Sequence, residues 1–376
     1  MRILVLNYEF PPVGGGGGRA AAALCSALAE RGHELKVITS SAPKLTRSEA
    51  LDGYQVFRVQ AGRRSRFRAS FASMVGFVGG ALLPAMRMAR SWRPDVIHAH
   101  FAVPTGALAF PLSKITQLPY VLTAHLGDVP GGVPEKTDRW FRFVFPFTPP
   151  IWMGASKVVA VSEHTKTLAL RHYDVDIEVI PNGVQLRSYA EKHVSDPPRL
   201  IFAGRFQSQK NLPMLVELLA KVRDIPWQCE LLGDGPDRQI VEDLVQSHDL
   251  GSRVKLWGWV DGSIVEERLE ASDLVLLTSR SEGFPVIGVQ ALANGLAILA
   301  SNVGGLPELV ESDVNGRLCG VDDLDCFEQA LRWCLEDRKR LLKMKQASCA
   351  RAERFDIRKI AEQYEAVFEE AVQREV

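Results

Sequence analysis

Several features are missing from this sequence, and each absence removes a class of function. Lysine and arginine number 45, and aspartate and glutamate also number 45, so no charge excess is available to neutralise nucleic-acid phosphates. The six cysteines show no C-x-x-C spacing, so we assign them no chemistry and expect a reduced, cytosolic chain. The first residues, MRILVLNYEF, lack the longer apolar core of a signal peptide, so the sequence predicts a cytoplasmic protein.

Acidic residues are also missing from one long stretch. Residues 53–94 contain none, while arginines accumulate at positions Arg58, Arg63, Arg64, Arg66, Arg68, Arg87, Arg90 and Arg93. Between the arginine groups lies FASMVGFVGGALLPAM, a helical pattern that Gly79, Gly80 and Pro84 interrupt. A spanning helix needs about 20 clean apolar residues. The stretch therefore predicts a one-signed surface beside either a core helix or a helix that lies on an anionic membrane.

The length of 376 residues indicates two α/β domains with a cleft between them, because it exceeds what one ordinary core accommodates. Charged residues and prolines replace any apolar period between Gln185 and Pro198, where we place the boundary. The predicted domains are 1–185 and 198–356. Residues 1–185 carry 21 basic and 13 acidic side chains, or +8, and the remainder carries 24 against 32, or −8.

A glycine-rich segment follows the first predicted strand, at 3–7. The loop EFPPVGGGGG precedes a helix that we expect to begin near Arg19, and its consecutive glycines let the backbone approach a ligand closely. The G-x-G-x-x-A pattern of NAD-dependent oxidoreductases is nominally satisfied by Gly16, Gly18 and Ala21. That function is disfavoured, because the glycines do not directly follow the strand and the next strand ends in two serines without an acidic ribose ligand.

Histidines stand on or after two further predicted strands. His98 and His100 share one face of the strand DVIHAH, and without a third ligand nearby they favour cleft-lining or buried histidines over a zinc site. The strand PYVLTA ends at His125, and Asp128 follows three residues later. Ligands of α/β sheets bind at this carboxyl edge, so His125 is a candidate site residue. The alternative is a histidine satisfied within a turn.

Two cations follow the first predicted strand of the second domain, LIFAG. Arg205 comes directly after Gly204, and Lys210 lies five residues further along, ahead of a helix. They fit a diphosphate clamp, because without a metal ion Arg and Lys must offset the charge that grows as a nucleotide leaves. The alternative is a pair of solvated surface cations. Later strands lead to a glycine turn at Gly233 and to Trp259, whose ring could stack on a base.

The segment from Thr278 to Pro307 has the pattern of a strand end, a tight turn, a helix and another strand. The apolar run DLVLL before it is typical of a buried parallel strand, and Pro285 stands where a first helical position is expected. Free amides of that first turn favour a bound anion such as phosphate. Glu282 would repel a phosphate, so it either faces sugar hydroxyls or merely favours the helix N-terminus electrostatically.

These motifs resemble the retaining, nucleotide-sugar-dependent glycosyltransferases of family 4 (GT4), whose GT-B fold has two facing Rossmann-like domains. The most specific segments are Gly204-Arg205 with Lys210, and the turn that begins at Glu282. The family pattern is a glutamate, seven residues and a second glutamate, whereas this chain has Gln290 in the second position. In the family that second carboxylate commonly binds ribose hydroxyls, and Gln290 keeps a hydrogen-bonding side chain without the charge.

The resemblance implies roles for individual residues, with the last helix, about 357–376, crossing back to the first domain. The implied catalytic residues are His125, Arg205, Lys210 and Glu282. The implied donor-binding residues are Gly15, Gly16, Gly17, Gly204, Arg205, Lys210, Gly233, Trp259, Glu282, Gly283, Phe284, Pro285, Val286 and Gln290. The implied acceptor-side residues are His100, His125 and Asp128.

The resemblance further implies an enzyme that moves a sugar from a UDP- or GDP-sugar to an acceptor hydroxyl with retention, without a metal or other cofactor. Because Gln290 is no carboxylate, the paired acid and nucleophile of a retaining hydrolase is not supported, and the leaving phosphate would assist the incoming hydroxyl. We expect a lipid-linked or saccharide acceptor of envelope polysaccharide or glycolipid synthesis, peripheral membrane binding, and no nucleic acid. The rival functions are a non-catalytic sugar-nucleotide-binding protein and the NAD-dependent oxidoreductase.

Overall fold

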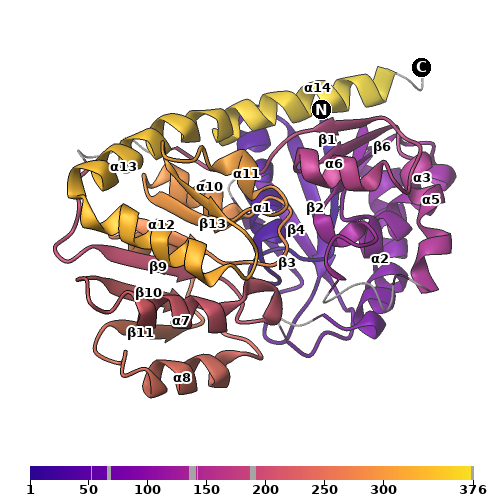
Figure 1. Cartoon of the computed structure of the whole chain (residues 1–376). Coiled ribbons are helices and arrows are strands. Elements are labelled where there is room, and N and C mark those ends of the chain that lie inside the picture. Colours follow the sequence, from indigo (N-terminus) through magenta and orange to yellow (C-terminus); the bar gives the residue numbers. More distant parts are fainter. Residues whose placement is uncertain (52, 66–68, 135–140, 142, 187–191, 374–376) are drawn as a thin grey trace. The chain divides into compact units, whose positions relative to one another are not determined.

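The computed structural model describes residues 1–376 except 52, 66–68, 135–140, 142, 187–191 and 374–376, which are drawn as a thin grey trace in Figure 1. The chain divides into two compact units. Unit 1 comprises Met1–Gly183 and Ile357–Val376, and unit 2 comprises Val184–Asp356. The boundary that the sequence places between Gln185 and Pro198 lies just inside unit 2, and its residues 187–191 are outside the described part of the chain.

Within its described residues, unit 1 contains an eight-stranded sheet with the order β3-β4-β2-β1-β5-β6-β7-β8. The strands are β1 (Arg2–Asn7), β2 (Glu34–Ser40), β3 (Ser48–Leu51), β4 (Tyr54–Val59), β5 (Val96–His100), β6 (Tyr120–Ala124), β7 (Lys157–Ala160) and β8 (Ile177–Val179). Strands β3 and β4 pair antiparallel, and the other neighbours pair in parallel. Because β1 lies between β2 and β5, a topological switch point falls between β1 and β5.

Helices cover both faces of this sheet (Figure 1). Ile3 and Val5 of β1 pack with α1 (Gly16–Glu30) and with the C-terminal helix α14 (Ile357–Gln373). Leu4 and Leu6 point to the other face, which is covered by α2 (Phe71–Trp92), α3 (Ala107–Thr116) and α5 (Pro149–Met153). Further helical segments of unit 1 are η1 (Ala102–Gly106), η2 (Leu126–Asp128), η3 (Phe145–Phe147) and α6 (Glu163–Ala169). The chain's C-terminal helix is thus part of the core of unit 1.

Helix α1 begins earlier than the sequence predicts. The glycine pattern predicts a loop up to Arg19, but Gly16, Gly17 and Gly18 already form the first helical turn. A Cβ atom on Gly18 would lie 2.4 Å from the backbone oxygen of Glu9, so no side chain fits there. The glycines therefore let the helix start against neighbouring backbone, and this close approach outweighs their poor helix propensity.

Helix α2 is continuous, although the sequence predicts interruptions at Gly79, Gly80 and Pro84. Gly76 and Gly80 lie against the backbone of residues 60–61, where a Cβ atom on either glycine would come within 2.8 Å of a carbonyl oxygen. Pro84 forfeits one helical hydrogen bond without ending the helix. Gly76 and Gly80 thus let the helix pack closely against the segment that follows β4.

Two of the arginines predicted to form a one-signed surface are buried instead. The Arg58 guanidinium donates to the Pro11 carbonyl at 2.9 Å and pairs with Glu49. The Arg63 side chain is 0% exposed and lies 3.6 Å from Glu9. Both acidic partners lie outside the acid-free stretch 53–94, so the composition of that stretch alone does not reveal these ion pairs. Exposed positions are Arg64, Arg87, Arg90 and Arg93, whereas Arg66 and Arg68 fall outside the described residues.

Unit 2, in its described residues, contains a six-stranded parallel sheet with the order β11-β10-β9-β12-β13-β14. The strands are β9 (Arg199–Ala203), β10 (Gln228–Leu232), β11 (Val254–Gly258), β12 (Leu274–Leu277), β13 (Ala297–Ser301) and β14 (Gly316–Cys319). The helices are η4 (Ser208–Lys210), α7 (Leu212–Lys221), α8 (Arg238–Ser247), α9 (Gly262–Glu270), α10 (Val286–Ala293), α11 (Leu306–Leu309), α12 (Leu324–Glu336), α13 (Arg338–Ala352) and η5 (Glu353–Phe355). A second switch point lies between β9 and β12. The prediction of two Rossmann-like α/β domains is confirmed.

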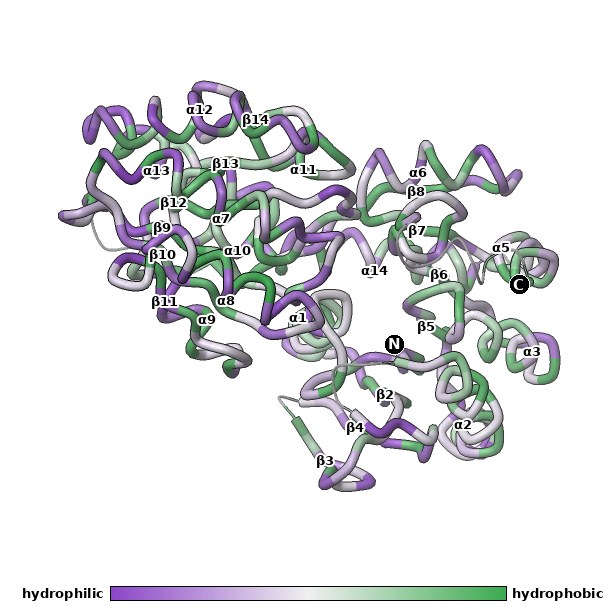
Figure 2. Tube along the Cα trace, turned by 60° about the horizontal axis from the view of Figure 1, so that its bottom comes forward, coloured by the Kyte–Doolittle hydropathy of each residue, from purple (hydrophilic) through white to green (hydrophobic). Residues whose placement is uncertain are grey.

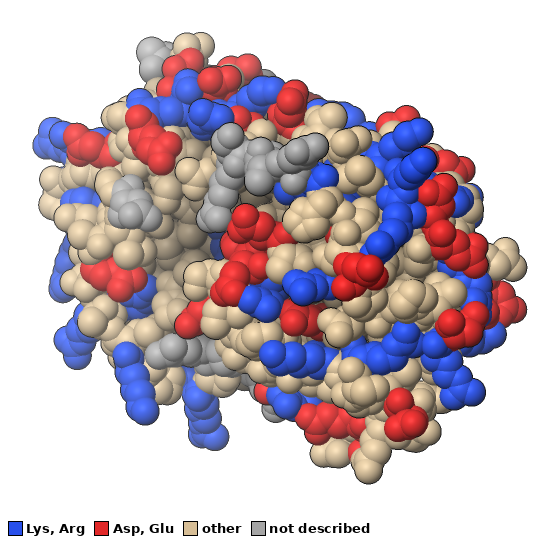
Figure 3. Space-filling view, turned by 90° about the vertical axis from the view of Figure 1, so that its left-hand side faces the viewer, with Lys and Arg blue, Asp and Glu red and all other residues tan. Residues whose placement is uncertain are grey.

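The surface of unit 2 carries charges of both signs in close pairs. Arg332 contacts Asp224 at 2.7 Å and Glu328 at 3.1 Å, and Lys221 contacts Glu328 at 3.0 Å. Figure 3 shows basic and acidic side chains interspersed over most of the face that it presents. Interspersed signs do not produce the one-signed field that attracts a nucleic acid.

Candidate functional site

The switch point of unit 2 brings together the two loops in which the sequence places most donor-binding residues. The first loop follows β9 and contains Gly204, Arg205 and Lys210. The second follows β12 and contains Glu282. Parallel α/β sheets bind ligands at this carboxyl edge, next to the N-termini of the helices that follow the strands. Here those helices are α7 and α10.

Hydrogen bonds hold these two loops against each other. The Arg280 amide donates to the Gln209 carbonyl at 2.8 Å, and the Gln209 side chain donates to the Ser281 carbonyl at 2.9 Å. The Thr278 hydroxyl donates to the Lys210 carbonyl at 3.0 Å. Because each loop supplies donors and acceptors to the other, the position of Lys210 and that of Glu282 are linked.

Lys210 and Glu282 form an ion pair at the junction of these loops. The Lys210 ammonium donates to Glu282 Oε1, which also accepts from the Ser279 hydroxyl at 2.7 Å. The Lys210 and Glu282 side chains are 17% and 7% exposed, so the pair is largely removed from solvent. An ammonium has three donors, so Lys210 can hold Glu282 and still donate to a second acceptor. This contact offsets the charge of the Glu282 carboxylate close to the start of α10.

The backbone of Glu282 is fixed by a glycine that the sequence analysis did not select. Gly304 has a φ of +59°, and a Cβ atom on it would lie 1.6 Å from the Glu282 carbonyl oxygen. The amide of Gly305 donates to the same oxygen at 3.3 Å. In the sequence, this contact is indicated by the pair Gly304 and Gly305 shortly after β13, since glycine permits a close approach between two backbone segments.

Glycines also join the ends of β9, β10 and β11. Gly233 has a φ of +140°, and a Cβ atom on it would lie 1.8 Å from the Gly204 carbonyl oxygen. The Gly204 amide donates to the Leu232 carbonyl at 2.9 Å, and the Gly233 amide donates to the Gly258 carbonyl at 2.8 Å. Trp259 follows β11 directly and is half-buried. Gly204, Gly233 and Trp259 therefore all lie at the carboxyl edge of the unit 2 sheet.

Helix α10 presents uncapped amides at this edge. Pro285 is its N-cap residue, one position before the first helical position that the sequence predicts, and it makes no side-chain capping hydrogen bond. Phe284 is 4% exposed and packs on Phe355 with ring centroids 5.4 Å apart, so its ring anchors the turn in the core and leaves only its backbone for a ligand. Gly283 and Val286 are half-buried beside it. The free amides support the predicted anion-binding turn.

Gln290 contacts Glu266, an acidic residue that no motif in the sequence indicates. Its side-chain amide donates to Glu266 of α9, and the Asn294 side chain donates to the other Glu266 oxygen at 3.1 Å. A carboxylate therefore does lie beside position 290, but it comes from another helix. Gln290 and Glu266 are 24 residues apart, so no local pattern in the sequence signals the contact.

The switch point of unit 1 carries the predicted glycine segment. Gly15 is the N-cap residue of α1, and Gly16 and Gly17 lie in its first turn. A Cβ atom on Gly17 would lie 2.7 Å from the Phe101 ring and 3.5 Å from Cε1 of His125. The rings of Phe101 and His125 stack with centroids 4.2 Å apart. The structure thus brings Gly17 and His125, both selected from the sequence, to one place.

Three histidines form a row beside this helix start. The ring centroids of His98 and His100 are 4.2 Å apart, and those of His100 and His125 are 6.0 Å apart. Burial lowers the pKa of His98 to about 3 and the pKa of His125 to about 4, and it also lowers the pKa of His100. All three imidazoles are therefore neutral at pH 7. Among the described residues, no cluster of His, Cys, Asp and Glu could hold a metal ion.

Several polar atoms of this region lack a partner. Both ring nitrogens of His100, Nε2 of His125 and Nδ2 of Asn7 are buried without a hydrogen bond to any described residue. Asn7 lies next to His100 in the register of β1 and β5. Buried polar atoms are normally paired, so unpaired donors and acceptors at a switch point indicate where a polar ligand could complete them.

Asp128 holds the turn of His125. Its carboxylate accepts from the His125 amide at 2.9 Å and from the Val103 amide at 3.3 Å. Burial raises the pKa of Asp128 to about 7, although these backbone amides act in the opposite direction. Asp128 thus faces the backbone of the turn and positions His125.

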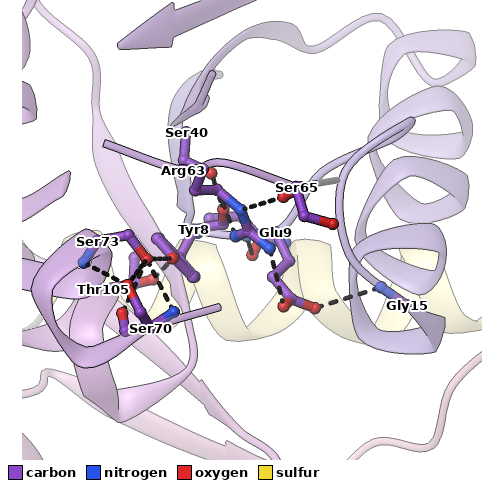
Figure 4. Close-up of polar contacts among 10 residues, drawn as sticks. Tyr8, Glu9, Gly15, Ser40, Arg63, Ser65, Ser70, Ser73 and Thr105 are labelled. Atoms are coloured by element: carbon purple, nitrogen blue, oxygen red, sulfur yellow. Dashed lines mark hydrogen bonds and ion pairs between the residues drawn. The ribbon is translucent and has the colours of Figure 1, made fainter. Parts of the chain in front are cut away.

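A polar network under the glycine segment is drawn in Figure 4. Arg63 lies over the Tyr8 ring at 4.6 Å and contacts Glu9 at 3.6 Å. Glu9 in turn accepts from the Gly15 amide at 3.2 Å. The Tyr8 hydroxyl bonds the Ser73 hydroxyl of α2 at 2.7 Å. The network thus links the start of α2 to the N-cap of α1, and no motif in the sequence marks its side chains as site residues.

Two family models match successive parts of the chain. Residues 14–188 match the model described as glycosyltransferase family 4, and residues 187–351 match the model described as glycosyl transferases group 1. The N-acetyl-alpha-D-glucosaminyl L-malate synthase of Bacillus anthracis is 26% identical, over 96% of this chain and 94% of that protein. A glycogen synthase of Mycobacterium tuberculosis is 26% identical, over 90% and 86%.

Solved structures share the fold. A sucrose-phosphate synthase from Thermosynechococcus elongatus superposes with a TM-score of 0.84 at 22% identity, over 98% of both chains. The structure of Anabaena HepE in complex with UDP has a TM-score of 0.72 at 21% identity, over 98% of this chain and 99% of that one. With the two family matches, these findings lead to one conclusion. This chain is a sugar-transferring enzyme that belongs to the group 1 glycosyltransferases of family 4, with the GT-B fold.

Proposed function

We propose that unit 2 binds a nucleotide-diphosphate sugar, a UDP- or GDP-sugar, and that the enzyme transfers its sugar with retention of configuration. The observation that carries this proposal is the Lys210–Glu282 ion pair beside the uncapped start of α10. A cation next to free helix amides suits a diphosphate, and a carboxylate held by that cation suits sugar hydroxyls. Anabaena HepE, which shares the fold, has been solved in complex with UDP and with UDP-glucose.

In this proposal the two cations bind the diphosphate and the carboxylate binds the sugar. Arg205 and Lys210 bind the diphosphate and offset the charge that develops as it leaves, so the reaction requires no metal ion or other cofactor. Glu282 accepts hydrogen bonds from the donor sugar, because Lys210 and Ser279 already hold one of its oxygens in place. The bond from the sugar to the phosphate oxygen breaks and the bond to the acceptor oxygen forms on the same face. The leaving phosphate takes the hydroxyl proton.

The acceptor belongs, in this proposal, to unit 1. His100 and His125 are neutral and carry buried nitrogens without a partner, so they can bind hydroxyl groups without attracting a charge. We place the acceptor hydroxyl at this row. A saccharide or lipid-linked saccharide supplies such hydroxyls, and we propose that the acceptor belongs to envelope polysaccharide or glycolipid synthesis.

A nucleotide screen tests the donor proposal. Purified protein is heated with UDP, GDP, ADP and their glucose conjugates, and the sugar nucleotide that stabilises it most is then tested for nucleotide release in the presence of saccharide acceptors. We expect one base to raise the melting temperature in a concentration-dependent way, because a ligand that binds the folded state stabilises it. No stabilisation by any nucleotide diphosphate or sugar nucleotide would contradict the proposal.

We further propose that unit 1 docks on an anionic lipid surface at the cytoplasmic face of a membrane. Helix α2 exposes three large apolar side chains, since Phe71, Val75 and Leu83 are 57%, 57% and 61% exposed. Figure 2 shows α2 with α3 and α5 along one side of unit 1, with hydrophobic segments of α2 in green. Arg87 and Arg90 are exposed near the end of the same helix. Apolar and basic side chains together suit anionic lipid.

The structure favours a helix that lies on the membrane over one that crosses it. Among the described residues, α2 alone is long and apolar enough to cross a bilayer, by length and composition. Its other face, however, is packed in unit 1 through Ser73, Phe77, Ala81, Ala85 and Ala89. A helix with one face in a core cannot be surrounded by lipid.

Vesicle flotation tests the membrane proposal. We expect binding to phosphatidylglycerol vesicles at low salt that falls steeply by about 0.5 M salt, since screening shortens the reach of each charge. Changing Arg64, Arg87 and Arg90 to Ser should abolish binding, whereas the matched change of Arg223, Lys339 and Lys343, all exposed on unit 2, should not. Equal binding to neutral vesicles, or none at low salt, would contradict the proposal. Arg63 is left unchanged because its side chain is buried.

A further inference from the structure

Gln290 of α10 and Glu266 of α9 contact each other in unit 2, on two helices next to the proposed donor site. Both residues are in the second turn of helices that follow parallel strands, α10 after β12 and α9 after β11. Their side chains therefore lie near the carboxyl edge of the unit 2 sheet. Gln290 stands four residues after Val286, about 6 Å along the helix axis. That spacing is comparable to the span from a diphosphate at the first turn of α10 to the hydroxyls of its own ribose.

The contact between the two side chains has a defined direction. The Gln290 amide nitrogen donates to Glu266 Oε1, and the Asn294 amide nitrogen donates to Glu266 Oε2. A carboxylate only accepts hydrogen bonds, so Glu266 can pair with the nitrogen of Gln290 and not with its oxygen. Because nitrogen and oxygen diverge from the same carbon, the Gln290 oxygen is turned away from Glu266. Among the described residues, the Gln290 side-chain oxygen has no hydrogen-bond partner and is not one of the buried, unpaired atoms, so it is open to a ligand.

We propose that Glu266 is a positioning residue that orients Gln290, so that the Gln290 amide oxygen accepts hydrogen bonds from the ribose hydroxyls of the donor nucleotide. The inference rests on the proposed function, because it requires a nucleotide at this edge. An amide has one acceptor atom and one donor atom, and without Glu266 it could present either to the ribose. The neighbouring carboxylate removes this ambiguity and lets glutamine serve where a carboxylate would otherwise be needed.

The proposal changes the expected effect of Gln290→Glu on nucleotide binding. If position 290 simply lacked a carboxylate, Gln290→Glu would strengthen nucleotide binding. With Glu266 in contact, Gln290→Glu instead places two carboxylates side by side, and like charges at this distance disfavour each other. We therefore expect Gln290→Glu to weaken binding. Combined with Glu266→Gln, the same change restores a single amide and a single carboxylate in reversed order.

Calorimetric titration of four proteins tests the proposal: the parent, Glu266→Ala, Gln290→Glu, and the double variant Glu266→Gln with Gln290→Glu. The ligand is the nucleoside diphosphate that stabilises the parent most among UDP, GDP and ADP, and the comparison ligand is its 2′,3′-dideoxy form. We expect roughly tenfold weaker binding of the ribose form by Gln290→Glu, the scale of one lost hydrogen bond, and a smaller loss of about twofold to threefold by Glu266→Ala, in which the Gln290 amide still presents its oxygen part of the time. The double variant should return to within about threefold of the parent. The dideoxy form should bind all four proteins alike.

The matched control is Glu270→Ala, which removes an exposed carboxylate from the same helix as Glu266. This variant should bind the ribose form as the parent does.

Two outcomes would overturn the inference. Equal losses for the ribose and dideoxy forms would mean that Glu266 only supports the fold. A double variant no better than Gln290→Glu would mean that the direction of the contact does not matter. Failure of the proposed function looks different, because the parent itself would then bind none of the three diphosphates.

Discussion

The two switch points differ in how their polar atoms are satisfied. In unit 2 the polar side chains bond to one another: Lys210 pairs with Glu282, and the Gln290 amide donates to Glu266. In unit 1 both ring nitrogens of His100 and Nε2 of His125 are buried and unpaired among the described residues. Groups that are already paired are held in place before a ligand arrives, which suits a constant anionic group. Unpaired neutral groups gain their partners from the ligand, which suits hydroxyls.

Removing a cation from unit 2 should have the largest effect. We expect Arg205→Ala to slow sugar transfer on the order of 100-fold or more, the scale for losing one contact to charge that develops in the transition state. Steady-state assays of nucleotide release measure the effect. The nucleoside without phosphates serves as the control ligand and should bind the variant as it binds the parent. Transfer at the parental rate would remove Arg205 from the diphosphate site.

Glu282→Gln should have a smaller and more selective effect. The amide keeps the shape but loses the charge, so we expect kcat to fall roughly tenfold or more while the affinity for free nucleotide diphosphate changes little. Measuring kcat and the dissociation constant separately distinguishes the two roles. A loss of nucleotide affinity as large as that of Lys210→Ala would move Glu282 from the sugar to the phosphates.

Acidification should destabilise the protein through the histidine row of unit 1. The folded-state pKa values of His98 and His125 are about 3 and about 4, below the ordinary value, so between about pH 6.5 and pH 4 the unfolded chain binds more protons. Stability is therefore present above about pH 6.5 and is lost as the pH falls. The pKa of Asp128 is raised to about 7, so on acidification this carboxyl takes up its proton first in the folded state and opposes the destabilisation. It is one group, whereas the histidine row contributes three.

Urea unfolding at a series of pH values measures this dependence. His98→Gln should flatten the slope between pH 6.5 and pH 4, because it removes one of the groups that titrates only in the unfolded chain. The surface variant Arg223→Ser should leave the slope unchanged. Stability that stays constant or rises on acidification would show that these imidazoles are not held neutral.

The smallest effect is expected from the network below the glycine segment. Ser73→Ala removes the partner of the buried Tyr8 hydroxyl, so we expect a loss of stability of about 1 kcal/mol. Turnover should stay near that of the parent, because Ser73 only supports the start of α2. Chemical denaturation and kcat on the same preparation provide both values. A large loss of turnover at unchanged stability would instead give this network a direct part in the reaction.

Local patterns in the sequence were sufficient for much of the fold. The strands appear as apolar runs, because parallel strands are covered on both faces, and β5, β6 and β12 lie within one or two residues of their expected bounds. Ser162 caps α6, accepting from the Thr165 amide at 3.1 Å, which is a common role for a serine directly before a helix. Helix α2 was misjudged because glycine lowers helix propensity in isolation, whereas here it permits close packing on residues 60–61.

Contacts between residues that are distant in the sequence could not be predicted from local patterns. The sequence places Lys210 and Glu282 at two strand ends, but only the parallel order of β9 and β12 brings them into contact. The sequence predicts that Arg63 is a surface charge, whereas in the structure its side chain is buried against Glu9 and the Tyr8 ring. Glu266 lies on a helix without any motif, and its importance appears only through the bond from Gln290.

The affinity of the Lys210→Ala variant for nucleotide tests the central claim most directly. The nucleoside diphosphate that stabilises the parent most, among UDP, GDP and ADP, is titrated calorimetrically into the parent and into the variant, and the matching nucleoside is titrated into both. If Lys210 holds the diphosphate in unit 2, the diphosphate should bind the variant at least about tenfold more weakly, the scale of one charge-assisted hydrogen bond, while the nucleoside binds both proteins equally. Equal diphosphate affinity in the two proteins would contradict a donor site built on Lys210 and Glu282.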